Sequence, residues 1–83
     1  MREQFIERIS EPNLDSLLDK LLDKDVINDD EMEAAMGKSL RADKARYVID
    51  TVRRKGNQPS SDMIHIVCQL DANVFQLQPS STD

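Results

Sequence analysis

The sequence predicts an all-α domain, and three observations support that prediction. The chain has 83 residues, enough for one domain with a modest core. It contains two Phe, one Tyr and no Trp, so the core must consist mainly of aliphatic side chains. In the stretches 14–22 and 45–52 those aliphatic residues stand three and four positions apart, which is the spacing of one helix face. We therefore expect short amphipathic helices around a single aliphatic core.

The first predicted helix is short and covers residues 2–9. Its apolar face consists of Phe5, Ile6 and Ile9. A second helix should follow at once, because Ser10 is a good N-cap and Pro12 is tolerated in a first turn. Five leucines form its apolar stripe: Leu14, Leu17, Leu18, Leu21 and Leu22. We expect this helix to end near Lys24, since Asp25 would otherwise fall inside the leucine stripe.

Capping residues mark the third and fourth helices. Asn28 followed by Glu31 is a capping-box pattern, and Gly37 is expected to end the short helix that begins there. Its inward residues are predicted to be Met32, Ala35 and Met36. The fourth helix is predicted within residues 41–56, with Gly56 as its terminating glycine. Its apolar stripe is formed by Ala45, Val48, Ile49 and Val52.

The last third of the chain predicts a loop and two more helices. Pro59 and the paired serines in residues 57–61 indicate a loop that ends in an N-cap. The fifth helix would then bury Met63, Ile64, Val67 and Leu70. Asp71 can cap a short sixth helix with Val74, Phe75 and Leu77 as its apolar residues. Residues 79–83 are expected to form a linker or flexible tail.

Charge is distributed unevenly along the chain. The net charge is −5, with −6 in residues 1–40, +4 in residues 41–56 and −3 in residues 57–83. An acidic balance argues against a dedicated nucleic-acid binder, while the asymmetry favours electrostatic pairing with another protein. No apolar run reaches about 18 residues and the N-terminus is charged, so we expect neither a membrane span nor a signal peptide. A soluble protein of the cytoplasm is the expectation.

Two helix faces concentrate this charge. Asp15, Asp19 and Asp23 stand four residues apart on the second predicted helix, where each like-charged pair costs about 0.2–0.5 kcal/mol. Asp15 and Asp19 have no cation three or four residues away, although Asp15 gains some support from the nearby helix N-terminus. Arg46 and Arg53 project together beside the apolar stripe of the fourth helix, and Lys44 and Lys55 flank its other side. We therefore expect the charges on these faces, that of Asp19 above all, to meet a partner.

Catalytic, metal and cofactor sites are not expected. His65 and Cys68 share a predicted helix but have neither an electropositive setting nor an orienting third group, and we expect both to be buried or half-buried. The acidic stretch 23–33 lacks the central glycine of a calcium loop and has Ile27 at a ligand position. One His and one Cys cannot make a zinc site, and no glycine-rich phosphate loop is present.

Four segments, in order and spacing, resemble a known family. They are Leu17-Leu18-Asp19 with Leu21-Leu22, then Val26-Ile27-Asn28 with Glu31-Met32, then Asp43-Lys44, Arg46, Ile49-Asp50 and Lys55-Gly56, and finally Ile64, Ile66 and Cys68. This pattern is similar to the caspase recruitment domain (CARD), and most similar to the N-terminal CARD of inflammatory caspases. The resemblance assigns residues 1–78 to the domain.

The resemblance implies a six-helix antiparallel bundle of the death-fold type that binds other CARDs and has no catalysis of its own. In the family, an acidic patch on the second helix of one copy meets a basic patch on the first and fourth helices of another. Asp19 matches the acidic contact, Arg46 the basic contact and Arg2 its first-helix part, while face geometry adds Asp15, Asp23 and Arg53. A contact between unlike patches is head-to-tail, so repetition implies an open helical assembly.

The implied partners are an inflammatory caspase, an adaptor or a sensor that carries a CARD. Glu3 and Glu7 stand where related caspase CARDs tend to be more basic, and Lys20 follows Asp19 where a second acid is common. We interpret these differences as devices that set partner specificity. Two other functions stay open, a CARD-only decoy that inhibits caspase recruitment and a helical domain that binds nucleic acid.

Overall fold

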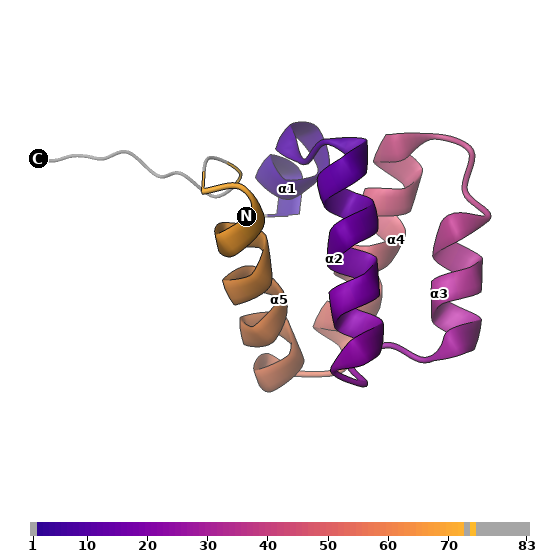
Figure 1. Ribbon diagram of the computed structural model, residues 1–83, viewed down its shortest axis with the longest axis vertical. Coiled ribbons are helices and arrows are strands. Elements are labelled where there is room, and N and C mark those ends of the chain that lie inside the picture. The colour runs from indigo at the N-terminus through magenta and orange to yellow at the C-terminus, as the bar shows by residue number, and fades with distance from the viewer. Residues whose placement is uncertain (1, 73, 75–83) are drawn as a thin grey trace, which may run out of the picture.

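The computed structural model describes residues 2–72 and residue 74, and this part of the chain forms five α-helices without strands. The helices are α1 (Arg2–Arg8), α2 (Glu11–Asp23), α3 (Asp29–Met36), α4 (Arg41–Arg54) and α5 (Asn57–Leu70). Helices α2 to α5 run alternately up and down, and α1 lies at the upper end of the bundle (Figure 1). The all-α, antiparallel prediction is confirmed for the described residues.

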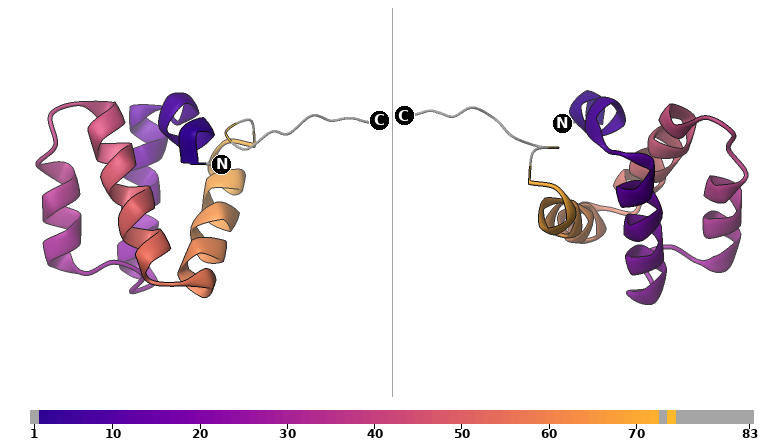
Figure 2. Two further views of the ribbon diagram at one scale, coloured as in Figure 1. Left: turned by 180° about the vertical axis from the view of Figure 1, so that it is seen from behind. Right: turned by 45° about the horizontal axis from the view of Figure 1, so that its top comes forward.

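One aliphatic core joins all five helices, and both predicted stripes contribute to it. Leu14, Leu17, Leu18 and Leu21 of α2 are buried, as are Ala45, Val48, Ile49 and Val52 of α4. Helix α4 packs against each of the other four helices, whereas α1 packs against α4 alone. Figure 2 shows α4 from behind, with α1 beside its upper end. The position of α1 therefore depends on its contacts with α4.

Local capping explains where α2 and α3 begin. The Ser10 hydroxyl accepts a hydrogen bond from the Asn13 N–H at 3.3 Å, as expected of an N-cap. At α3 the capping box is complete, because the Asn28 side chain accepts from the Glu31 N–H at 2.8 Å and Glu31 accepts from the Asn28 N–H at 3.0 Å. These predicted helix starts are confirmed.

The expected loop at residues 57–61 is wrong. Helix α5 begins at Asn57, directly after Gly56, whose φ of +119° turns the chain within one residue. Pro59 fits inside the first turn, where backbone N–H groups have no helical acceptor. The Ser60 hydroxyl donates to the Gly56 carbonyl at 2.8 Å. A glycine-made corner and a first-turn proline thus replace the loop that the same residues suggested.

Two further expectations about burial are corrected. Met36 is 49% exposed, because Ala35 takes the inward position at the end of the short α3. His65 and Cys68 are both exposed, because Met63, Ile66 and Val67 make the buried stripe of α5 and leave them outside it.

The predicted sixth helix, residues 71–77, lies largely outside the described residues. Asp71 has an extended backbone and Val74 is buried in the core. Of the described helices, none has the length and apolar content to cross a membrane.

An aspartate occupies a left-handed position at the end of α2. The Asp25 N–H bonds the Leu22 carbonyl at 3.0 Å and the Val26 N–H bonds the Leu21 carbonyl at 2.9 Å, which is the Schellman pattern. Asp25 has a φ of +61° there, at a position where glycine is usual. Its negative charge also lies at the negative end of the helix dipole.

We expect Asp25→Gly to raise the free energy of unfolding by about 0.5–1 kcal/mol, because glycine removes the left-handed strain and the unfavourable charge. Urea denaturation followed by circular dichroism measures the change. Asp25→Asn removes only the charge and should give a smaller gain. A glycine variant less stable than the wild type would show that the Asp25 side chain stabilises the turn.

Candidate protein interaction surface

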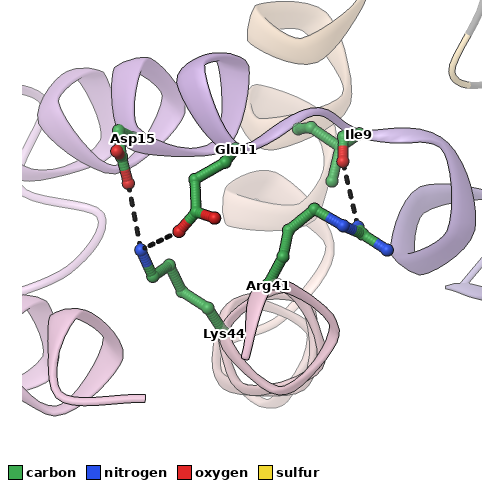
Figure 3. Close-up of polar contacts among 5 residues, drawn as sticks. All are labelled: Ile9, Glu11, Asp15, Arg41 and Lys44. Carbon is green, nitrogen blue, oxygen red and sulfur yellow. Dashed lines mark hydrogen bonds and ion pairs between the residues drawn. The ribbon is translucent and has the colours of Figure 1, made fainter. Parts of the chain in front are cut away.

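Lys44 of α4 is a buried cation that joins α4 to α2. Its side chain is 6% exposed, and its Nζ lies 2.9 Å from Glu11 Oε2 and 3.2 Å from Asp15 Oδ1 (Figure 3). The hydrogen bond to Glu11 raises the pKa of Lys44, and the contact with Asp15 adds to it against the effect of burial. The cation that Asp15 lacks on its own helix therefore comes from α4.

Arg41 of α4 donates hydrogen bonds to carbonyls at the C-terminal end of α1. Its Nη1 donates to the Ile6 and Ile9 carbonyls at 2.5 and 2.9 Å, and Figure 3 shows the second of these contacts. Carbonyls at a helix C-terminus lack partners within the helix, and a cation there opposes the negative end of the dipole. Arg41 is thus a structural cap supplied by another helix.

Arg2 and Asp50 form a two-pronged ion pair between α1 and α4. Arg2 Nε lies 2.7 Å from Asp50 Oδ1, and Arg2 Nη2 lies 3.0 Å from Asp50 Oδ2. The hydrogen bond from Arg2 lowers the pKa of Asp50 and outweighs the opposing effect of burial. The same hydrogen bond raises the pKa of Arg2. One of the predicted interaction residues is therefore already engaged inside the domain.

Glu31 links α3 to the end of α4. It completes the α3 capping box and also pairs with Lys55, whose Nζ lies 3.0 Å from Glu31 Oε1. Burial raises the pKa of Glu31, but the Asn28 N–H and the Lys55 contact together outweigh it and lower the pKa. Lys55 is thus also used within the domain.

A groove between α1 and α4 contains two of the predicted basic residues. It is lined by Arg2, Glu3, Ile6, Glu7, Arg41, Ala42 and Arg46. Arg46 is 2.7 Å from Asp43, one turn earlier on the same helix. Arg53 is exposed and lines a neighbouring hollow with Asp50 and Arg54. The structure therefore brings Arg2, Arg46 and Arg53 to the α1 side of α4.

The acidic residues divide into two groups. Asp15 is half-buried at the contact with α4, whereas Asp19 and Asp23 are exposed on α2. No ion pair joins either of these two to another described residue. Helix α2 faces the viewer in Figure 1, and α4 does so from behind in Figure 2. The exposed acids therefore lie on α2, and the groove lies between α1 and α4.

The described residues contain no group of three His, Cys, Asp or Glu side chains that could hold a metal ion. His65 and Cys68 are exposed on α5, and the His65 Nε2 lies 3.3 Å from Gln69 Nε2. The histidine ring is thus paired with a side-chain amide one turn further along α5.

Sequence reasoning missed the structural roles of Lys44, Arg41 and Asp50. One observation pointed towards the first of them, namely that Asp15 has no cation within its own helix. The other two act on α1, about 35 to 48 residues away in the chain. No local pattern marks such long-range contacts.

We expect Lys44→Met to lower the free energy of unfolding by about 1–2 kcal/mol, since Glu11 and Asp15 would then face each other without a cation. Both carboxylates are about half exposed, so the loss stays below that of a fully buried pair. Chemical denaturation measures it, with exposed Lys20→Met as the control. Adding Asp15→Asn should recover part of the loss, and a Lys44→Met variant as stable as the wild type would contradict the stabilising role.

The Asp50 ion pair predicts a pH dependence. Because the folded-state pKa of Asp50 is lowered, the unfolded state binds more protons in acid, so this contribution is present above about pH 4 and is lost as pH falls below it. Asp50→Asn should therefore destabilise at pH 7 and differ less from the wild type at pH 3. Urea midpoints at both pH values test this. Asp19→Asn is the control, and an equal Asp50→Asn effect at both values would contradict the pair's contribution.

Comparison with known proteins agrees with this fold. The caspase recruitment domain family matches residues 1–78. Caspase-1 of Mus musculus is 40% identical over 81 residues, which are 93% of this chain and 20% of that protein. Caspase-1 of Equus caballus is 39% identical over 76 residues, 90% of this chain and 19% of that protein. The human putative caspase recruitment domain-containing protein 17P is 32% identical over 74 residues, 88% of this chain and 67% of that protein.

The chain spans about a fifth of the length of these caspase-1 relatives. No solved structure matches it. The family match covers all five described helices, including the core stripes of α2 and α4 and the capped start of α3. The chain belongs to the caspase recruitment domain (CARD) family.

Proposed function

We propose that this chain is a CARD–CARD interaction module that recruits or clusters an inflammatory caspase in inflammasome or cell-death signalling in the cytoplasm. The observation that carries the proposal is the separation of charge on a CARD bundle. Exposed Asp19 and Asp23 lie on α2, while Arg2, Arg46 and Arg53 lie beside α1 and α4. The likeness to Caspase-1 supports a caspase or its CARD-bearing adaptor or sensor as the partner.

The two unlike surfaces favour a head-to-tail contact. The acidic surface of one domain meets the basic surface of the next, and each added domain again presents the surface that the previous one used. Exposed ion pairs are worth only about 0–1 kcal/mol each, so charge sets register and partner choice. Repetition of the contact supplies the strength of a helical assembly.

Asp15 is the least available of the predicted contact residues. It shares Lys44 with Glu11 and is half-buried, so a partner reaches it only at the edge of the α2–α4 contact. We therefore assign the main acidic contact to Asp19, with Asp23 beside it and Asp15 at the margin.

A second candidate function is a CARD-only decoy that inhibits caspase recruitment. The relatives of this chain include the human putative caspase recruitment domain-containing protein 17P, at 32% identity, as well as Caspase-1. Such a decoy uses the same surfaces but delivers no protease. The two functions therefore differ in whether a complex with a caspase grows or stops.

We expect Asp19→Lys and Arg46→Glu each to limit growth of complexes with the matching region of mouse Caspase-1, and the double variant to abolish binding. Each single change leaves one usable surface, whereas the double variant leaves none. Size-exclusion chromatography with light scattering, at low and moderate salt, measures complex size. Growth with the wild type supports clustering, and a complex of fixed small size supports the decoy.

Asp62→Lys, a charge reversal on α5, is the control and should bind as the wild type does. Circular dichroism must show the same helical content in all variants. Binding by the double variant at wild-type strength would refute the assigned surfaces.

A further inference from the structure

The α1–α4 groove contains more negative charge than its arginines suggest. Three arginines, Arg2, Arg41 and Arg46, line it together with Glu3 and Glu7. Asp50 and Asp43 lie at 2.7 Å from Arg2 and Arg46, respectively. The three groove cations thus have four carboxylates beside them.

Each of the three arginines already has a hydrogen-bond acceptor within the domain. Asp50 accepts hydrogen bonds from two nitrogens of Arg2. Arg41 donates to the Ile6 and Ile9 carbonyls at the end of α1. Arg46 has one nitrogen on Asp43. An incoming carboxylate must therefore compete with a carboxylate that is already in place, and it must also approach Glu3 and Glu7.

The acidic surface of α2 has no such compensation. Asp19 and Asp23 are exposed, and neither forms an ion pair with another described residue. Lys20 and Lys24 each directly follow one of the two aspartates in the sequence, but neither forms an ion pair with them, so a partner cation meets their charge directly. The two surfaces that the proposed function uses are therefore unequal.

We propose that Glu3, Glu7, Asp43 and Asp50 compensate the α1–α4 groove, so that this chain binds chiefly through its open acidic α2 surface to a domain with an uncompensated basic surface. A second copy of the chain is then a poor partner, because its groove is compensated and only Arg53 and Arg54, around Asp50, add exposed positive charge beside it. This inference rests on the proposed function and adds which of the two surfaces works and which kind of partner it selects.

Self-association of the isolated chain tests the proposal, because removing groove carboxylates should create a good partner surface. Glu7→Lys should lower the concentration for half-association about threefold to fivefold, and Glu3→Gln with Glu7→Lys about tenfold. Both residues are exposed, and a lysine in the last turn of α1 favours the helix dipole. Analytical ultracentrifugation at low salt measures the change, which should shrink at 0.5 M salt.

Glu33→Lys is the matched control, because it makes the same change at an exposed position of α3 outside the groove. It should shift half-association by less than twofold, with unchanged circular dichroism. A gain no larger than that of Glu33→Lys would overturn the proposal, as would a wild type that associates as strongly as the double variant.

Adding Asp19→Lys to the double variant separates this proposal from the proposed function. Loss of the gain supports both, because the opened groove then requires the acidic α2 surface of another copy. A gain that survives Asp19→Lys would leave groove compensation standing and overturn the acidic-to-basic contact. No gain in the double variant would overturn groove compensation alone, since binding to the Caspase-1 region tests the contact independently.

Discussion

The fold depends on α4 being both the apolar centre of the bundle and the source of its charged contacts. Its stripe of small and β-branched residues packs against every other helix. Around that stripe, charged groups reach three neighbours. Asp50 and Arg41 contact α1, Lys44 contacts α2, and Lys55 at the C-terminal end contacts α3. Charged side chains on a central helix must find partners close by, because water reaches them only in part.

This constraint changes the meaning of the charge pattern. Residues 41–56 carry +4 and residues 1–40 carry −6, which as a linear sequence looks like two surfaces offered to partners. In the folded domain much of that charge is used internally, with Lys44 shared by two acids of α2 and Lys55 taken by α3. Only the charged side chains without a partner inside the domain are available to other proteins. The charge available to the proposed contact is therefore set by which ion pairs the fold has already made.

Local rules were enough for most of the fold. The five leucines, the Ser10 cap and the Asn28 capping box determine α2 and the start of α3 within a few residues of chain, so sequence predicted them correctly. The loop predicted at residues 57–61 was wrong because proline and serine are common both in loops and in the first turn of a helix. Only the packing of α5 decides between the two structures. The prediction that Met36 points inward was wrong because a two-turn helix has few positions that face the core.

The sequence predicted which charged residues share a helix face, but not which of them are already paired within the domain. Helical spacing groups Arg46 with Arg53 and Asp19 with Asp23, since i, i+4 and i+7 geometry is local. It could not show that Asp50 holds Arg2, because 48 residues separate them. The same face of a helix can therefore be basic in sequence and nearly neutral in the folded domain. In the proposed contact between unlike charged surfaces, this difference decides whether a domain meets its own copies or selects another protein.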